Sequence, residues 1–313
     1  MLPNRVPVKF GYNPSSTGNL PLGLAIDKGY YAQAGLDVTV TVFPGAANAY
    51  IPSLAKGDLD IIAANASSSL LNARSGGFDV QLFLPTTADK VGYTSTFGIM
   101  ARPELVDSGR LNAPQSLKGL HVDGLAQGTW ADYLMGKLVA DQGLSGQVKL
   151  SYLAKTPPDL LSLMSKGAVD VSPQLEPLAT QMETQGIAKK WKTGADIAPG
   201  VPSGYLIGSG NFLGNNRCAA VAFARATQKA TADILASQGQ WTPQLVDETA
   251  KITKLSKDTI QATGHTPYFV TDPKIDPKPL QDLTSYFKAT GLLAGNVDIN
   301  ALINNSVSDA LSK

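Results

Sequence analysis

Small hydroxyl and amide side chains recur in this 313-residue chain wherever a strand-like run is followed by a helix-like run. With the unpaired backbone N–H groups at helix starts, such side chains bind polar or anionic groups through hydrogen bonds. The candidates are Tyr12, Ser16, Thr17, Asn19, Gly45, Asn48, Asn65, Ser67 and Ser68 in the first half, and Gln127, Thr129, Trp130, Gln174, Glu176 and Tyr205 in the second. Each of these residues alone is equally well explained as a helix cap or turn residue. Their recurrence at matched positions favours a ligand-binding site.

Larger side chains among the candidates have two interpretations each. The ring of Trp130 would either cover the body of a ligand or pack between helices. Glu176 would either accept a hydrogen bond from a ligand amine or hydroxyl, or hold a strand end or helix start. A fully anionic ligand would be unfavourable beside that carboxylate. Tyr12 and Tyr205 lie near predicted strand ends, where their hydroxyls would add contacts.

Residues suited to catalysis or metal binding are sparse. His121 and His265 do not have metal-ligand spacing, and Cys218, the single cysteine, lies in an Ala-rich run that indicates a small core residue. One cysteine forms neither an internal disulfide nor a cysteine-based metal cluster. The sequence also contains no phosphate-binding P-loop and no Gly-x-Ser-x-Gly motif. We therefore expect no catalytic residue, no metal and no cofactor; an enzyme on the same scaffold is the less favoured alternative.

The elements that position the candidates alternate along the first half of the chain. Strands are predicted at 6–12, 37–43, 59–64 and 80–84, and helices at 19–33, 50–56 and 67–74. This order predicts an α/β fold with a mainly parallel sheet. In such sheets ligands bind beyond the carboxyl ends of the strands, where the helices begin and where the candidates lie.

An internal repeat indicates two lobes. The run Lys56-Gly57-Asp58-Leu59-Asp60-Ile61 returns 110 residues later as Lys166-Gly167-Ala168-Val169-Asp170-Val171. Chance similarity between α/β segments is the alternative explanation. A true repeat makes segments 8–97 and 118–203 two similar α/β lobes. The last 110 or so residues are mostly helical and have too few strands for a sheet of their own, so we expect them to pack on lobe I.

Composition excludes some classes of function. Charged residues make up 16% of the chain and the net charge is +1, so there is no electrostatic footprint of a nucleic-acid-binding protein. No run approaches the roughly 20 apolar residues of a membrane span. The first five residues lack an apolar leader. That start is compatible with a cytoplasmic protein, or with an exported one whose leader or lipid-anchor segment has been removed.

Several runs together resemble the aliphatic-sulfonate/nitrate/taurine family of periplasmic binding proteins, a group also described as thiamine-pyrimidine-synthase-like. They occur in the same order over nearly the whole chain, at 11–12, 21–38, 43–46, 54–60, 167–177 and 280–293. The resemblance implies the type II binding-protein fold, with lobe I at 1–97 plus 204–313 and lobe II at 98–203. Two hinge crossings are expected, near 97–102 and 202–206.

The same resemblance implies a function. Such a protein is the solute-binding subunit of an ABC importer; it works in the periplasm or as an anchored extracellular protein and presents a small molecule to a membrane permease. We expect a monomer. A ligand-sensing module is the alternative. The related pyrimidine synthases use a cysteine-rich iron site, which a chain with Cys218 alone does not match. The candidate loops carry no Arg or Lys, which favours a polar or anionic organic molecule, such as a sulfonate or aromatic carboxylate, over a bare inorganic anion.

Overall fold

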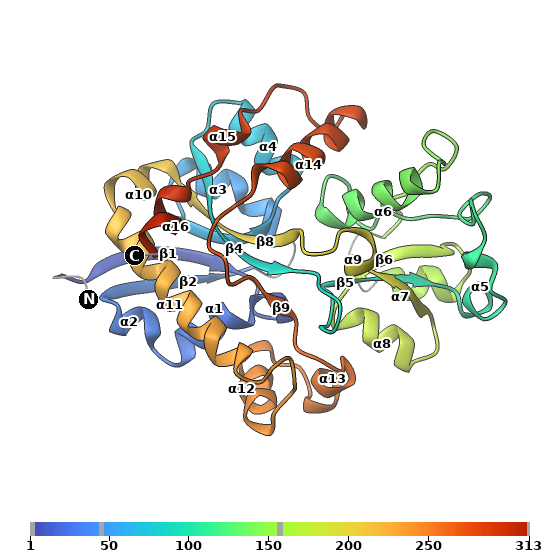
Figure 1. Cartoon of the computed structure of the whole chain (residues 1–313), viewed down its shortest axis with the longest axis horizontal. Helices are drawn as coiled ribbons and strands as arrows, with labels where there is room; N and C mark the ends of the chain where they lie inside the picture. Colours follow the sequence, from blue (N-terminus) through green and yellow to red (C-terminus); the bar gives the residue numbers. More distant parts are fainter. Residues whose placement is uncertain (1–3, 44–46, 155–158, 312–313) are drawn as a thin grey trace.

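Two separate sheets form the centres of two lobes (Figure 1). The computed structural model describes residues 4–43, 47–154 and 159–311. The larger sheet has the order β2-β1-β3-β8-β4-β9, and the smaller one has the order β6-β5-β7. The larger sheet contains β1 (Val6–Tyr12), β2 (Leu36–Val42), β3 (Ile61–Asn65), β4 (Val80–Ala88), β8 (Pro202–Ser209) and β9 (Tyr268–Phe269). The smaller sheet contains β5 (Phe97–Ala101), β6 (Val171–Leu175) and β7 (Lys189–Thr193).

Parallel pairing covers only part of the larger sheet. β1 runs parallel to β2 and to β3, as the βαβ order predicts. β8 lies between β3 and β4 and is antiparallel to both, and in the smaller sheet β5 is antiparallel to β6 and β7. The expectation of a mainly parallel sheet is therefore wrong. β8 and β5 enter their sheets directly from the other lobe, without the crossover helix that makes neighbouring strands parallel.

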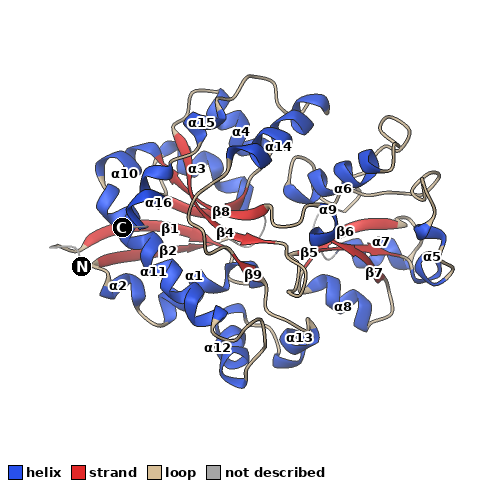
Figure 2. Cartoon of the chain, in the orientation of Figure 1, coloured by secondary structure: helices blue, strands red, loops and turns tan. Residues whose placement is uncertain are grey.

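Helices cover both faces of the larger sheet (Figure 2). On lobe I these are η1 (Thr17–Asn19), α1 (Leu20–Asp27), α2 (Tyr30–Gln33), η2 (Ala47–Tyr50), α3 (Ile51–Lys56) and α4 (Ser68–Ser75). The helix expected at 19–33 is divided because Gly29 adopts a φ of +68°, a conformation that ends α1. The helices of lobe II are α5 (Pro103–Asp107), η3 (Arg110–Asn112), α6 (Trp130–Asp141), α7 (Asp159–Ser165), α8 (Leu178–Thr184) and α9 (Gly194–Ile197).

The C-terminal helices wrap around lobe I and also reach lobe II. They are α10 (Gly210–Asn215), α11 (Arg217–Leu235), α12 (Pro243–Thr253), α13 (Lys257–Ala262), α14 (Pro277–Ala289), α15 (Ile299–Leu302) and α16 (Asn305–Leu311). α11 packs on α1, α2 and α16, and α15 and α16 pack on β4. α13 contacts α8 and α14 contacts α6, both in lobe II. The tail thus lies mainly on lobe I and adds contacts between the lobes.

The internal repeat is visible in the backbone. Gly57 and Gly167 follow equivalent helices, with φ values of +80° and +70°. The backbone N–H of Lys9 donates to Asp60 Oδ2 at 2.8 Å, and the Asp60 N–H donates to the Lys9 carbonyl at 2.9 Å. The same pair of bonds joins His121 and Asp170, each at 2.8 Å. Each lobe therefore uses an aspartate at the end of the repeated run to join neighbouring strands.

Two links join the lobes, and both lie a few residues earlier than expected. The first comprises residues 89–96, because β5 at Phe97–Ala101 already belongs to the smaller sheet. The second comprises residues 198–201, because β8 at Pro202–Ser209 already belongs to the larger one. The links also touch each other, since the Gly200 N–H donates to the Asp89 carbonyl at 2.8 Å.

Candidate ligand-binding site between the lobes

The loop after β1 provides the first candidates in lobe I. Asn19 is fixed by a 2.9 Å hydrogen bond from its side-chain amide to the Asn13 carbonyl. Thr17 is buried, while Ser16 is half-buried and its hydroxyl makes no capping bond to η1. A Cβ placed on Gly18 would lie within 4 Å of the methyl groups of Thr87 and Thr96. The loop therefore lies against the first link between the lobes.

The loop after β3 provides the second group. Asn65 donates its side-chain amide to the Ser203 carbonyl at 2.6 Å, at the start of β8. Ser67 caps α4 by accepting the Leu70 N–H at 3.3 Å. The backbone N–H of Ser68 donates across to the Gly128 carbonyl of lobe II at 2.9 Å. This bond joins a helix start of lobe I directly to a candidate loop of lobe II.

The facing loop of lobe II precedes α6. Gly128 has a φ of +75°, and a Cβ there would stand 2.1 Å from Ser68 Oγ, so a side chain would separate the two loops. Gln127 is exposed beside it. The Thr129 hydroxyl is half-buried and donates to the Ala126 carbonyl at 2.6 Å. Gln127, Thr129 and Ser68 are thus brought together across the junction between the lobes.

The side chain of Trp130 packs in the core of lobe II and is not exposed to a ligand. Its side chain is only 2% exposed, belongs to the core shared by α6 and the smaller sheet, and lies 5.1 Å from the Tyr133 ring. A ring so enclosed contributes mainly to folding. Trp130→Ala is therefore expected to disturb the fold, in keeping with the second of the two interpretations, packing between helices.

Glu176 and Gln174 are also buried, and their side chains make hydrogen bonds within lobe II. Glu176 is 2% exposed; its Oε1 accepts from Lys190 Nζ at 2.7 Å and its Oε2 accepts from the Thr180 N–H at 3.1 Å. Burial lowers the pKa of Lys190, but Glu176 and the more distant Glu183 outweigh it, so that pKa lies above its usual value. Gln174 is fully buried, and its Oε1 accepts the Leu175 N–H at 2.8 Å. Glu176 holds the start of α8, the structural alternative for this residue.

The two candidate tyrosines are buried in lobe I. Tyr12 stacks on Phe10, and its hydroxyl lies close to Gly23 of α1. The Tyr205 hydroxyl donates to the Pro202 carbonyl at 3.1 Å. Burial raises the pKa of both phenols. Gly45 lies outside the described residues, and Asn48 lies in η2.

Sequence analysis missed a group of polar residues at the links themselves. The hydroxyls of Thr87 and Ser203 lie 3.4 Å apart, between β4 and β8. A Cβ on Gly204 would lie 2.5 Å from the Thr87 hydroxyl oxygen and 2.7 Å from that of Thr86. The sequence signal was the pair of double-hydroxyl motifs, 86–87 and 95–96, that bracket the first link. These side chains add further polar groups at the junction.

Asp89 is the second group that sequence analysis missed. It is 1% exposed, and its Oδ1 accepts the Thr96 N–H at 2.6 Å. Its Oδ2 has no hydrogen-bond partner among the described residues and faces Gly194, where a Cβ would lie 1.8 Å away. Burial raises the pKa of Asp89 to about 6, although hydrogen bonds from Thr96 and Ser95 oppose the shift. The first link therefore begins with a buried acidic group of raised pKa, at the point where it touches the second link.

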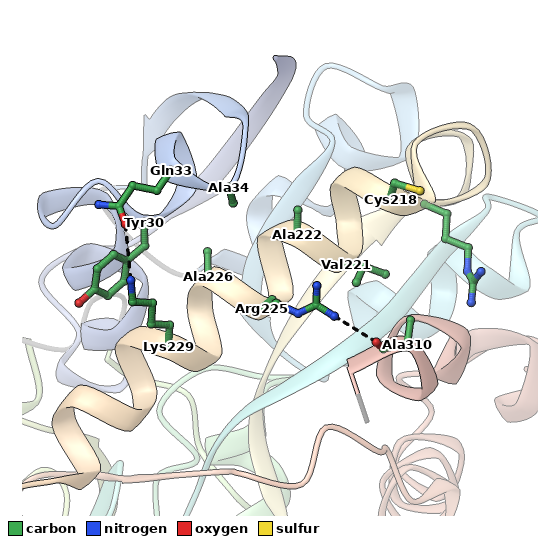
Figure 3. Close-up of a pocket in the computed structure, with 11 residues that line it drawn as sticks. Tyr30, Gln33, Ala34, Cys218, Val221, Ala222, Arg225, Ala226, Lys229 and Ala310 are labelled. Atoms are coloured by element: carbon green, nitrogen blue, oxygen red, sulfur yellow. Dashed lines mark hydrogen bonds between the residues drawn. The ribbon is translucent and has the colours of Figure 1, made fainter. Parts of the chain in front are cut away.

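A hollow lies away from this junction, on the outer side of lobe I. It has a volume of about 640 Å³ and lies between α2, α11 and α16 (Figure 3). Arg225 donates to the Ala310 carbonyl at 3.3 Å, and Lys229 Nζ lies 4.0 Å from the centre of the Tyr30 ring. Cys218 is exposed on this side, so its interpretation as a core residue is wrong; α11 buries other faces through Ala219, Ala220 and Phe223. None of the candidate residues lines this groove.

Two further kinds of feature are absent from the described residues. Within 4–43, 47–154 and 159–311, no cluster of three or more His, Cys, Asp or Glu side chains is arranged to hold a metal ion. In the same part of the chain, no helix has both the length and the apolar character needed to cross a bilayer.

Known proteins share this fold over nearly the whole chain. The periplasmic aliphatic sulphonate binding protein SsuA from Escherichia coli has a TM-score of 0.77 at 19% identity, covering 95% of this chain and 92% of its own. The alkanesulfonate-binding protein SsuA from Xanthomonas axonopodis pv. citri, bound to MOPS, has a TM-score of 0.75 at 17% identity, covering 97% and 99%. The periplasmic nitrate-binding protein NrtA from Synechocystis PCC 6803 has a TM-score of 0.69 at 15% identity, covering 100% and 89%.

The sequence itself supports the same relationship. No curated protein matches it. The family model described as NMT1/THI5 like matches residues 16–240, well over half of the chain. The expected resemblance and the expected two-lobed binding-protein fold are both confirmed. The chain belongs to the NMT1/THI5-like family.

Proposed function

We propose that this protein is the solute-binding subunit of an ABC importer and captures a small polar or anionic organic molecule between its lobes. The observation that carries the proposal is the meeting of polar helix starts from both lobes, where the Ser68 N–H donates to the Gly128 carbonyl beside the two links. Two lobes joined by short links close by rigid-body motion around a ligand. Family membership and the solved binding proteins of the same fold support this assignment.

The two moving parts lie on either side of the two links: lobe I comprises the residues up to 88 together with those from 202 onward, and lobe II comprises residues 97–197. Ser16, Asn65, Ser67 and Ser68 supply the lobe I side of the site, and Gln127 and Thr129 supply the lobe II side. A closed junction excludes water, which strengthens the hydrogen bonds made there. A sulfonate or aromatic carboxylate offers the acceptors that N–H and hydroxyl donors recognise.

The protein returns its ligand chemically unchanged and delivers it, as a monomer, to a permease on the outer face of a cytoplasmic membrane. Support comes from side chains that are already held by contacts of their own: Glu176 is paired with Lys190 inside lobe II, and the Thr129 hydroxyl donates to the Ala126 carbonyl. Solved relatives of the same fold that act as periplasmic binding proteins also support this location.

Native mass spectrometry of the purified protein tests the proposal. The expected result is a 1:1 complex with one small molecule, either co-purified or added from a panel of sulfonates and aromatic carboxylates. The released molecule is then compared with the starting compound by chromatography. Catalytic formation of a new product, or no complex with any small molecule from the source organism's extract, would contradict the proposal.

A further inference from the structure

Helix α14 of the C-terminal tail inserts a tyrosine into lobe II. The ring of Tyr286 occupies a slot on α6 that only a glycine leaves open, because a Cβ on Gly136 would lie 2.1 Å from a ring carbon. The Tyr133 ring meets it edge-on, with the centroids 5.6 Å apart and an interplanar angle of 77°. The two surfaces are complementary in shape, because the Tyr286 ring fills the space left by the absence of a side chain at Gly136.

The Tyr286 hydroxyl donates a hydrogen bond to the fully buried carboxylate of Asp132. Asp132 Oδ1 accepts from the Tyr286 hydroxyl at 2.9 Å and from the Tyr152 hydroxyl at 2.8 Å. Its Oδ2 accepts the Gly128 N–H at 2.7 Å. The Tyr286 hydroxyl also lies 3.2 Å from the Asp132 carbonyl. One carboxylate thus connects the tail, the interior of lobe II and the candidate loop at 126–130.

The other end of this connection is anchored in lobe I. α14 buries Leu280, Leu283 and Phe287 and contacts α4 and α15. Just beyond α14, the Asn72 side chain of α4 donates to the Leu292 carbonyl at 2.8 Å. The bonds from Tyr286 to Asp132 therefore cross from one lobe to the other, far along the chain from both links.

We propose that Tyr286 is an inter-lobe latch that holds the lobes together and, through Asp132, positions the lobe II half of the ligand site. Opening the lobes withdraws the ring from Gly136 and exposes the Asp132 carboxylate to water. The latch therefore shifts the equilibrium between open and closed forms toward the closed form before a ligand binds. Its effect on ligand affinity rests on the proposed function; its effect on closure does not.

Distances between spin labels, measured without any ligand, test the latch. One label occupies the native Cys218 on α11 of lobe I, and the other occupies Lys118→Cys, an exposed site of lobe II. The parent is expected to show a short-distance closed population. Tyr286→Phe keeps the ring but removes the hydroxyl, and we expect it to lower the closed-to-open ratio about three- to tenfold.

Two further variants separate the latch from a general loss of structure. Tyr152→Phe removes a hydrogen bond to the same Asp132 oxygen from within lobe II, so the ratio should stay at the parent value. Gly136→Ala fills the slot and should lower the ratio, as Tyr286→Phe does. A parent with no closed population, an unchanged ratio in both Tyr286→Phe and Gly136→Ala, or an equal shift in Tyr152→Phe would overturn the latch. Because no ligand is present, a failure of solute binding would leave this result intact.

Discussion

The starts of α4 in lobe I and α8 in lobe II are equivalent positions of the repeat, yet they are built differently. In lobe I, Ser67 caps α4 through its own hydroxyl. The residue 110 positions later is Pro177, which has no side-chain acceptor, and the neighbouring Glu176 carboxylate accepts the helix N–H instead. That carboxylate is buried and requires Lys190 as its partner.

This difference shows that the two copies of the repeat share a backbone arrangement but place different side chains in the two half-sites. Lobe I presents small polar side chains beside the links, including Ser16 and Asn65. Lobe II uses Trp130, Gln174 and Glu176 for its own packing and offers mainly the loop at 126–130. We therefore expect substitutions in lobe II to affect folding more than equivalent substitutions in lobe I.

The largest effect is expected for Trp130→Ala. The side chain is 2% exposed, and its removal leaves a cavity that costs about 3–5 kcal/mol of unfolding free energy. Denaturant unfolding followed by circular dichroism measures the loss. A variant as stable as the parent, but with weakened ligand binding, would show instead that the indole belongs to the ligand site.

A smaller loss is expected for Glu176→Gln, which leaves Lys190 without its closest partner. We expect the unfolding free energy to fall by about 2–3 kcal/mol, below the range for a fully buried pair because Lys190 is partly exposed. Glu183→Gln is the matched control: Glu183 is more exposed and 3.4 Å from the same Nζ, so the loss should stay under about 1 kcal/mol. Equal losses in both variants would contradict the structural role of Glu176.

Between the lobes, Asp89→Asn should stabilise the protein in a pH-dependent way. The pKa of Asp89 is raised to about 6, so the folded state holds this proton more tightly than the unfolded chain. The parent therefore loses stability as the pH rises from about 4 to 6, and the asparagine variant does not. The gain of the variant over the parent should be near zero at pH 4 and reach about 1–3 kcal/mol above pH 7. Thermal unfolding across this range checks it; a constant difference would exclude the titration.

The smallest effect is expected in lobe I. Ser67→Ala removes the cap of α4 and should cost about 1 kcal/mol. Ser69→Ala, at an exposed position of the same helix, is the control and should change stability by less than about 0.5 kcal/mol. A loss with Ser67→Ala as large as that with Glu176→Gln would remove the contrast between the lobes.

Features encoded in short segments were accessible from the sequence. The strand predicted at 6–12 is β1 (Val6–Tyr12), and the strand predicted at 37–43, where Val38, Val40 and Val42 alternate with polar residues, is β2 (Leu36–Val42). The two repeated Lys-Gly runs indicated two similar lobes. The structure agrees, because the glycine and the aspartate of each run have the same local geometry in lobe I and in lobe II. The family resemblance supplied the topology of the lobes, which periodicity alone does not determine.

Long-range features were not accessible in the same way. The antiparallel insertion of β8 between β3 and β4 joins segments more than a hundred residues apart. No local pattern shows that Lys190 neutralises Glu176, or that Tyr286 reaches Asp132 opposite Gly136. Trp130 was ambiguous because a helix start can face either a ligand or the core, and the choice depends on how the lobes pack.

Hydrogen–deuterium exchange with and without the solute identified by mass spectrometry tests the central claim most directly. Capture between the lobes predicts slower exchange in both half-sites, at residues 13–19 and 65–68 of lobe I and at 126–130 of lobe II. The outer surface of α11, at 217–229, should exchange equally in both states. Protection confined to one lobe, or centred on the α11 groove, would contradict capture between the lobes.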